Sequence, residues 1–263
     1  MTSGLYWLAG TCVAILVAAM ISIGRSGAGW GVWFCYMTGR LQTRIFCRWK
    51  ANNACPFPEE GPAIIVANHT SPVDPVIVWM RHFASFRKYR IRVIGFMMAR
   101  EYYLQRGPVG WVCRTMQSIP VARAGRDMGP VKEALKRLEA GHLLGLFPEG
   151  RLNDKSPDSQ LLAGGTGVAW LALKSRVPVI PVFIHNAPRS KSMIRVFFKF
   201  TRTSVTYGEP LDLSKWYDTK LSHEVLSAAT DQIMSAIAQL GGIEYSSAFR
   251  EYKVENTSNE CSD

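Results

Sequence analysis

A histidine and an aspartate stand five positions apart in the segment NHTSPVD, as His69 and Asp74. An imidazole held by a carboxylate can act as a general base that takes a proton from a hydroxyl group. The apolar run 63–67 before them is typical of a strand. Because five residues of an α-helix turn by about 500°, the two side chains can meet only if the chain bends between them.

The residues between them favour such a bend. Ser71 is a typical N-cap, Pro72 suits the first helical position, and Asp74 would be the third helical residue. Asp74 could then fold back onto one ring nitrogen of His69, which fixes the tautomer and leaves the other nitrogen as a base. The alternative is that Asp74 only caps the helix and His69 is an ordinary loop residue. A Ser71 hydrolase is disfavoured because the sequence has no Gly-x-Ser-x-Gly elbow.

A second segment, FPEGR, ends another apolar run at 143–147 and offers Glu149, Gly150 and Arg151 in succession. Glycine lets the backbone approach a phosphate, and a guanidinium grips phosphate oxygens with paired hydrogen bonds. Glu149 could bond a hydroxyl of the bound molecule or hold an arginine, so a structural ion pair between Glu149 and Arg151 is the alternative. A base beside an anion-binding loop predicts activation of a hydroxyl next to a phosphate.

These two segments resemble motifs of the glycerolipid acyltransferase family, which includes the 1-acylglycerol-3-phosphate acyltransferases. Two further blocks, SIPVAR at 118–123 and VPVIPV at 177–182, resemble the family in order and spacing, and the similarity covers residues 60–210. Many members read FPEGTRS, whereas here Arg151 follows Gly150 directly and Leu152 holds the usual arginine position. Some members share the direct Glu-Gly-Arg order.

The resemblance implies a membrane-bound acyltransferase that moves a fatty acyl group from a thioester to the hydroxyl of 1-acylglycerol 3-phosphate, giving phosphatidic acid in phospholipid synthesis. It implies His69 as the catalytic base and Asp74 as the residue that orients it. The acceptor site that it implies consists of Arg123, Glu149, Gly150 and Arg151. Acyl-CoA or acyl carrier protein would be the co-substrate, and neither a cofactor nor a metal is expected.

Other functions stay open at this point. The acceptor could be a lysophospholipid with another head group, or glycerol 3-phosphate itself. The chain could also be a basic membrane-binding protein that keeps the fold without turnover. The presence of both His69 and Asp74 favours an enzyme.

The chain is strongly basic, with 31 Lys and Arg against 20 Asp and Glu and a formal net charge of +11. This balance suits anionic partners such as membranes, phosphates, coenzyme A or nucleic acid. Nucleic acid is disfavoured because the charge is scattered and no zinc-finger spacing or RNA-binding motif is present. The six cysteines show no Cys-x2-Cys spacing, so we expect free thiols in a reducing compartment.

The N-terminal region predicts attachment to a membrane. Residues 5–23 carry no charge and are long enough to span a bilayer, and no Lys or Arg precedes them as in a signal peptide. Because basic residues follow the run, we expect a single anchor with the catalytic body on the cytoplasmic side. The apolar stretch 30–37 predicts an interfacial or re-entrant element. Arg40, Arg44 and Arg48 recur every four residues, which indicates a basic helix face for lipid head groups or a solvated face.

Strands and helices alternate after the proline-rich stretch 52–61. Strands are expected at 63–67, 92–99, 119–122, 143–147, 179–184, 194–200 and 204–207, and helices at 72–81, 127–140, 167–175 and 222–240, with a helical region through Cys113. Asp127 is the expected cap of the second of these helices. This alternation predicts an α/β fold with a mostly parallel sheet flanked by helices. The predicted divisions are an N-terminal segment at 1–52, an acyltransferase domain at 53–243 and a disordered polar tail at 244–263.

Overall fold

The computed structural model describes residues 2–80, 90–122, 127–154, 159–190, 192, 194–243 and 245, with the backbone alone for residues 2–6, 8 and 9. Arg123, a predicted acceptor-site residue, lies outside the described residues, as does the predicted tail except for Tyr245. The hydroxyl of Tyr245 donates to Asp231 Oδ1 at 3.1 Å, and its ring packs against the core. The predicted disorder of the tail at 244–263 stays a prediction.

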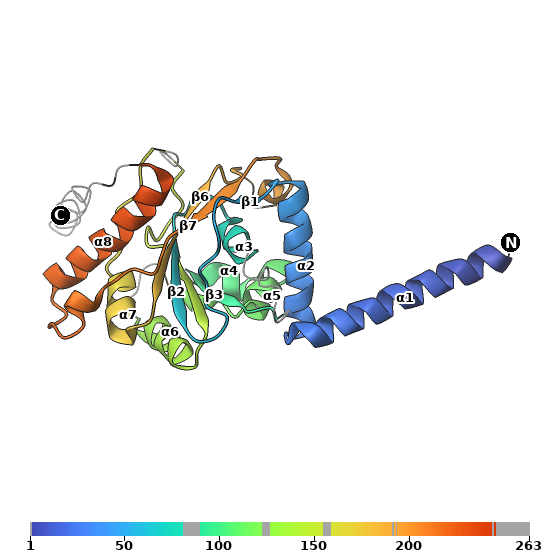
Figure 1. The fold of residues 1–263 in the computed structure, drawn as a ribbon, viewed down its shortest axis with the longest axis horizontal. Coiled ribbons are helices and arrows are strands. Elements are labelled where there is room, and N and C mark those ends of the chain that lie inside the picture. The colour runs from blue at the N-terminus through green and yellow to red at the C-terminus, as the bar shows by residue number, and fades with distance from the viewer. Residues whose placement is uncertain are drawn as a thin grey trace.

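The described residues form a seven-stranded sheet in the order β1-β7-β6-β2-β5-β3-β4. The strands are β1 Lys50–Ala51, β2 Ala63–Ala67, β3 Ile94–Ala99, β4 Ile119–Val121, β5 Leu143–Leu146, β6 Val179–His185 and β7 Ser204–Tyr207. Neighbouring strands are parallel except for β6 and β7. The predicted α/β fold with a mostly parallel sheet flanked by helices is confirmed (Figure 1).

Helices cover both faces of the sheet (Figure 1). The helices of the described residues are α1 Thr2–Ser26, which lies away from the sheet, α2 Trp30–Ile45, α3 Asp74–Trp79, α4 Arg100–Leu104, α5 Pro108–Thr115, α6 Gly129–Glu139, α7 Gly167–Ser175 and α8 His223–Gly241. Every residue of β2 and β5 is buried, as expected of parallel strands covered on two sides. Their apolar runs therefore lack the alternation of half-exposed strands.

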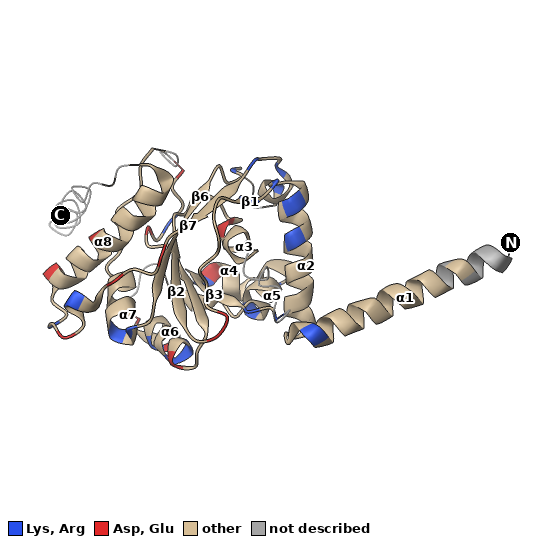
Figure 2. Cartoon of the chain, in the orientation of Figure 1, with Lys and Arg blue, Asp and Glu red and all other residues tan. Residues whose placement is uncertain are grey.

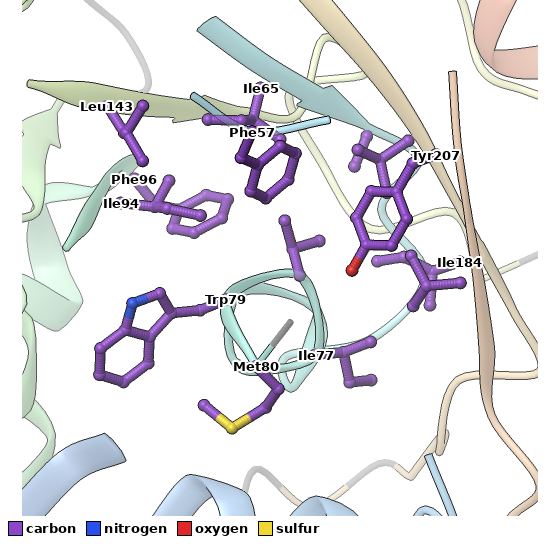
Figure 3. Close-up of a cluster of buried hydrophobic side chains, with 14 of the residues drawn as sticks. Phe57, Ile65, Ile77, Trp79, Met80, Ile94, Phe96, Leu143, Ile184 and Tyr207 are labelled. Atoms are coloured by element: carbon purple, nitrogen blue, oxygen red, sulfur yellow. The ribbon is translucent and has the colours of Figure 1, made fainter. Parts of the chain in front are cut away.

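Successive side chains of the central strands β2, β5 and β6 enter two different cores, because strand side chains alternate between faces. Ile65, Ile94 and Phe96 pack with α2 and α3 in one cluster (Figure 3). Ile64 and Leu144 pack with α6, α7 and α8 in the other. The helices that follow the adjacent strands β2 and β5 thus lie on opposite faces. In open α/β sheets, such a switch opens a crevice at the carboxyl ends of the two strands.

The N-terminal helix α1 projects away from the α/β body, whereas α2 packs against that body (Figure 1). Tyr36 of α2 is buried edge-on against Trp79, with 5.3 Å between ring centroids. Among the described residues, no single helix is long and apolar enough to cross a membrane. The helical segments Gly10–Ser26 and Trp30–Ile45 are together long and apolar enough to cross a membrane, but they are bent by 106° relative to each other. The predicted single anchor is therefore not shown and stays a prediction.

Two details of this region differ from expectation. The stretch 30–37 belongs to the longer helix α2, and α2 ends at Ile45. Arg48 lies beyond that end, with φ +44°, so only Arg40 and Arg44 share the helix. The strand β1 precedes the predicted domain boundary at residue 52 and pairs with β7, so the sheet begins earlier in the chain than expected.

The segment predicted as a strand at 194–200 is instead a short 3-10 helix, η2, at Arg195–Phe198. Its apolar alternation suits a strand, but the edge of β6 is already paired with β7, where His185 faces Ser204. The segment pairs with no strand in the described part of the chain and bonds within itself, from Phe197 N–H to Ile194 O at 3.1 Å.

Two predicted helix starts also differ. The helix expected at 127–140 begins at Gly129, and the Asp127 carboxylate accepts the Gly129 N–H at 2.8 Å two residues ahead. Asp127 thus closes a local turn before the helix rather than capping it. The helix expected at 72–81 is shorter within the described residues and begins at Asp74.

Candidate active site

Two loops meet at the carboxyl edge of the sheet, where β2 and β5 end side by side. The strands are parallel and Val66 lies opposite Leu146, so the loops that begin at residues 68 and 147 leave the sheet together. Asn68 is buried and fastens the first loop to β6. Its amide donates to Ile184 O at 3.1 Å, and its carbonyl accepts the Ile184 N–H at 2.8 Å. The Asn68 side chain thus pairs with the backbone of β6 as a strand residue would. This pairing fixes the position of the next residue, His69.

His69 and Asp74 are in contact, with 3.0 Å between Nδ1 and Oδ2. The same carboxylate oxygen accepts the backbone N–H groups of Thr70 and Ser71, each at 2.7 Å. These donors hold Asp74, which is fully buried, in one orientation. The contact favours the tautomer with hydrogen on Nδ1 and leaves Nε2 as the basic nitrogen. The side chain of His69 is 20 % exposed, so a substrate can reach the ring.

The bend between these two residues differs slightly from expectation. Asp74 is the first residue of α3 rather than the third, and Pro72 lies in the preceding turn. The Ser71 hydroxyl accepts the Val73 N–H at 3.2 Å and donates to Pro188 O at 2.5 Å. Because Ser71 is fully buried and its hydroxyl is engaged twice, it is not available as a nucleophile.

The imidazole lies on a stack of aromatic rings. The centroids of His69 and Phe147 are 4.0 Å apart with 13° between ring planes, and Phe147 stacks on Phe96 at 5.2 Å. A Cβ atom at Gly145 would stand 2.3 Å from the Phe96 ring, so a glycine is needed there to admit the stack. Sequence reasoning did not assign these rings to the site, although Phe147 begins the FPEGR segment.

Glu149 ties three loops together. Its Oε1 accepts the backbone N–H of His69 at 2.7 Å, and its Oε2 accepts that of Leu162 at 2.9 Å. Burial raises the pKa of this carboxyl to about 7, against the lowering effect of the N–H donors of Leu162 and His69. Both oxygens already have a backbone donor, so any bond to a substrate would add to this pairing or compete with it. The alternative of an ion pair with Arg151 is not seen among the described residues.

Gly150 and Arg151 are exposed and lie on the loop directly after Glu149. Gly150 has φ +67° and is exposed, and this left-handed conformation is one that glycine adopts at little cost. Arg151 is exposed, and its guanidinium has no hydrogen bond or ion pair within the described part of the chain. The loop returns to His69 two residues later, where the Asn153 N–H donates to His69 O at 2.7 Å. No group of His, Cys, Asp and Glu in the described ranges could hold a metal ion.

Comparison with known proteins identifies the family. Residues 48–185 match the model of the family described as "Acyltransferase". The chain belongs to the acyltransferase family. The match begins just before β1 and ends with the last residue of β6, so this family region contains the His69–Asp74 pair and the Glu149 loop.

Relatives of this acyltransferase-family chain have several names. It is 30 % identical to an N-acylphosphatidylethanolamine synthase of Arabidopsis thaliana over 129 residues, which are 48 % of this chain and 44 % of the plant protein. It is 24 % identical to a 1-acyl-sn-glycerol-3-phosphate acyltransferase of Bacillus subtilis over 191 residues, 73 % of this chain and 87 % of that protein. The matched region therefore spans less than half of the plant relative.

A solved structure shares the fold of this family member. It is PlsC of Thermotoga maritima, a 1-acyl-sn-glycerophosphate (LPA) acyltransferase. The TM-score is 0.58 at 23 % sequence identity, over 80 % of this chain and 78 % of that chain.

Proposed function

We propose that this chain transfers a fatty acyl group from a thioester to the hydroxyl of 1-acylglycerol 3-phosphate, with phosphatidic acid as the product. The observation that carries the proposal is the His69–Asp74 contact, with Nδ1 held at 3.0 Å and the ring still accessible. The family membership and the relatives named for this reaction support it.

In the proposed reaction the acceptor hydroxyl is the nucleophile. His69 Nε2 takes its proton as the oxygen attacks the thioester carbonyl, and Asp74 stabilises the imidazolium that forms. The tetrahedral intermediate collapses, the carbon–sulfur bond breaks, and the leaving thiolate takes the proton from Nε2. The acyl group is then an oxygen ester, and His69 returns to its neutral form. No covalent enzyme intermediate is needed, and the donor is acyl-CoA or acyl carrier protein.

The acceptor phosphate is proposed to bind at the loop with Gly150 and Arg151. The exposed guanidinium of Arg151, which has no partner among the described residues, supports this role, and Arg123 is the second candidate. We propose that Glu149 acts chiefly by positioning. It accepts the backbone N–H of His69, so it fixes the position of the imidazole relative to the Phe147 ring.

We further propose that the chain works at a membrane, with its N-terminal segment as the anchor and the catalytic domain on the cytoplasmic side. The 17 described residues at 10–26 include one charged residue, Arg25, and basic residues follow them. Several apolar side chains of α1 are exposed, among them Val13, Ile15, Leu16 and Met20. Exposed apolar surface of this length suits lipid better than water.

A second candidate acceptor is a phospholipid with another head group. The 30 % identity to a protein named N-acylphosphatidylethanolamine synthase favours it. Incubation of membranes containing the protein with a labelled acyl thioester and a panel of lipid acceptors, followed by mass spectrometry of the products, distinguishes the two. The proposed function predicts phosphatidic acid from 1-acylglycerol 3-phosphate, and the second candidate predicts an acylated ethanolamine lipid.

The base assignment is tested with His69→Ala. Because general-base assistance contributes about 10²–10⁴ in rate, we expect turnover below about a tenth of the wild-type value, with unchanged membrane attachment and a folded protein by circular dichroism. Greater residual turnover would contradict the assignment.

Asp74→Asn separates the catalytic role from the role in the turn. An amide oxygen can still accept backbone N–H groups at a helix start, but a neutral amide cannot stabilise an imidazolium. We expect a folded variant with severely reduced kcat. Nearly full activity would assign Asp74 to the turn alone.

A further inference from the structure

Apart from α1 and the outer face of α2, a second apolar surface stands open next to the carboxyl edge of the sheet. We define it as the η2 edge, formed by Ile194, Phe198 and Phe200, which are 72 %, 60 % and 66 % exposed. Three large apolar side chains within seven residues are costly to leave in water unless they contact another surface. Because this segment is a 3-10 helix and not a strand of the sheet, no strand within the described ranges pairs with it.

The η2 edge is fixed to the body by α2 and the residues just after it. The Gln42 amide donates to Phe197 O at 2.9 Å, and the Thr201 N–H donates to Phe46 O at 2.8 Å. The ring of Phe46 lies 5.5 Å from that of Phe198 and 5.1 Å from that of Phe200. The exposed rings are thus held on a framework rather than on a loose loop, so they present a surface of defined shape.

The charge around this edge has one sign. Arg195, Lys199 and Arg202 lie within or beside it and are exposed. Figure 2 shows basic residues at the end of α2 and on the adjoining segment, which is the orange segment beside α2 in Figure 1. The sequence has no Asp or Glu between 159 and 208, and none before Glu59. Aromatic rings interleaved with cations are the composition of surfaces that enter the boundary of anionic bilayers.

We propose that the η2 edge is a second membrane-contact surface, which inserts Phe198 and Phe200 among anionic lipid head groups independently of α1. A second copy of this chain fits the surface less well. A two-fold contact would place the edge against itself and bring like charges together. A bilayer provides negative charge and an apolar layer at once.

The position of the edge gives this contact a consequence. The segment leaves the end of β6, and its Pro188 carbonyl accepts the Ser71 hydroxyl at 2.5 Å, two residues from His69. β2 and β6 are parallel, so this segment and the loop with His69 leave the sheet at the same edge, and a bilayer seated on the η2 edge would lie at that edge. This consequence rests on the proposed function, because it would let a lysophospholipid enter from the membrane. The lipid contact itself does not depend on turnover.

A photo-crosslinking experiment on the full chain tests the contact. Phe198→p-benzoylphenylalanine keeps an aromatic side chain at the edge, and Met128→p-benzoylphenylalanine is the matched control. Met128 is 47 % exposed and precedes α6, which packs on the other core. With vesicles of phosphatidylcholine containing about 30 % phosphatidylglycerol, we expect a lipid adduct at position 198 at least about five-fold more abundant than at 128. Equal yields at the two positions would overturn the proposal.

A charge variant tests the preference for anionic lipid. Arg195→Gln/Lys199→Gln/Arg202→Gln should lower the adduct yield at position 198 several-fold at low salt. Lys132→Gln/Lys136→Gln/Lys174→Gln removes the same charge from α6 and α7 and should leave that yield unchanged. An equal loss in both variants, or none in either, would overturn the anionic part of the proposal. A crosslinked dimer through position 198, formed with or without vesicles, would assign the edge to a second copy.

The lipid adduct is read by mass spectrometry and needs no acyl donor. If no lipid adduct formed at position 198, the acyl-transfer proposal would be unaffected. A catalytically inactive protein can still form the adduct.

Discussion

A single oxygen, Asp74 Oδ2, lies within hydrogen-bond distance of His69 Nδ1 and accepts hydrogen bonds from two backbone N–H groups of the turn between the two residues. Asp74 therefore closes the turn before α3 and orients the imidazole with the same carboxylate oxygen, and Val73 is the N-cap residue of α3. The other oxygen, Oδ1, is buried and has no hydrogen-bond partner within the described residues. A buried oxygen of this kind costs free energy, which the contacts of Oδ2 must offset.

Glu149 gives a prediction about pH. Its pKa, raised to about 7 by burial, exceeds its usual value, so the folded state holds the proton more tightly than the unfolded state. The resulting stability is present below about pH 4.5 and is lost as the pH rises to about 7. Relative to Glu149→Gln, which stays neutral, the wild-type free energy of unfolding should fall by up to about 3 kcal/mol across that window. Thermal or urea unfolding at several pH values measures this difference.

Glu209→Gln serves as the control for Glu149→Gln, because it makes the same chemical change at an exposed position. If the wild type and Glu149→Gln gave parallel curves, the pKa of the Glu149 carboxyl would be the same in the folded and unfolded states. Its two backbone donors would then offset the effect of its burial.

Arg151 gives a prediction about substrate affinity. A guanidinium that binds a phosphate meets the same charge in the ground and transition states, so its loss raises KM and leaves kcat largely unchanged. We expect Arg151→Ala to raise the KM of the lysophospholipid and to spare that of the thioester. Arg151→Lys should recover part of the loss, because an ammonium cannot form the paired hydrogen bonds. Steady-state kinetics with each substrate varied in turn gives both values.

Arg123→Ala belongs in the same assay. If it raised the acceptor KM while Arg151→Ala did not, phosphate recognition would pass to Arg123. The exposure of Arg151 would then have another explanation than acceptor binding.

At the scale of elements, β5 supports the imidazole through a sequence of packed rings. Gly145 admits Phe96, Phe96 supports Phe147, and Phe147 supports His69. Glu149, in the loop after β5, accepts the backbone N–H of His69 in the loop after β2. The two parallel strands therefore fix both the backbone position of His69 and the orientation of its ring on Phe147.

Gly145→Ala should disturb this packing. The added methyl group would overlap the Phe96 ring, and overpacking of this kind costs about 1–3 kcal/mol. We expect a lower melting temperature and a lower kcat, because the displaced ring moves the support of His69. Gly167→Ala is the matched control, since a Cβ there meets nothing within 4 Å at the start of α7. Equal effects of the two substitutions would show that the aromatic stack does not matter.

At the scale of the whole molecule, the contacts of α1 with the body that the described residues show lie near its C-terminal end. Ser22 accepts the Trp33 indole N–H at 3.0 Å, and Ser26 O accepts the Ile91 N–H at 2.9 Å. The sheet and both cores lie in the part of the chain after residue 30. The stability of the α/β body should therefore depend little on residues 1–24, since their deletion removes the Ser22–Trp33 bond and leaves Ser26 in place.

Deletion of residues 1–24 should weaken membrane attachment and keep the α/β body folded. The truncated protein should still bind anionic liposomes at low salt through α2 and the following basic residues, and salt should release part of it. Flotation at low and high salt, with circular dichroism as the control for folding, measures both effects. A folded truncated protein that stayed wholly in solution at low salt would contradict an interfacial role for residues 30–50.

The sequence by itself determined the α/β class and most of the element order, and it predicted a contact between His69 and Asp74 beside the alternative of a helix cap. Those features depend on periodicity and on a turn of a few residues, which are local properties of the chain. Only five positions separate the imidazole from its carboxylate, so turn chemistry alone could predict their meeting.

Only the tertiary structure decided which distant groups complete the site. Glu149 reaches the His69 N–H from 80 residues away, where sequence reasoning expected a substrate contact or a partner arginine. The apolar alternation at 194–200 predicted a strand, but β7 had already taken the edge of β6. Sequence patterns report what each segment can do locally. Which acceptors and sheet edges remain free depends on the pairing of segments far apart in the chain, and that pairing exists only in the folded molecule.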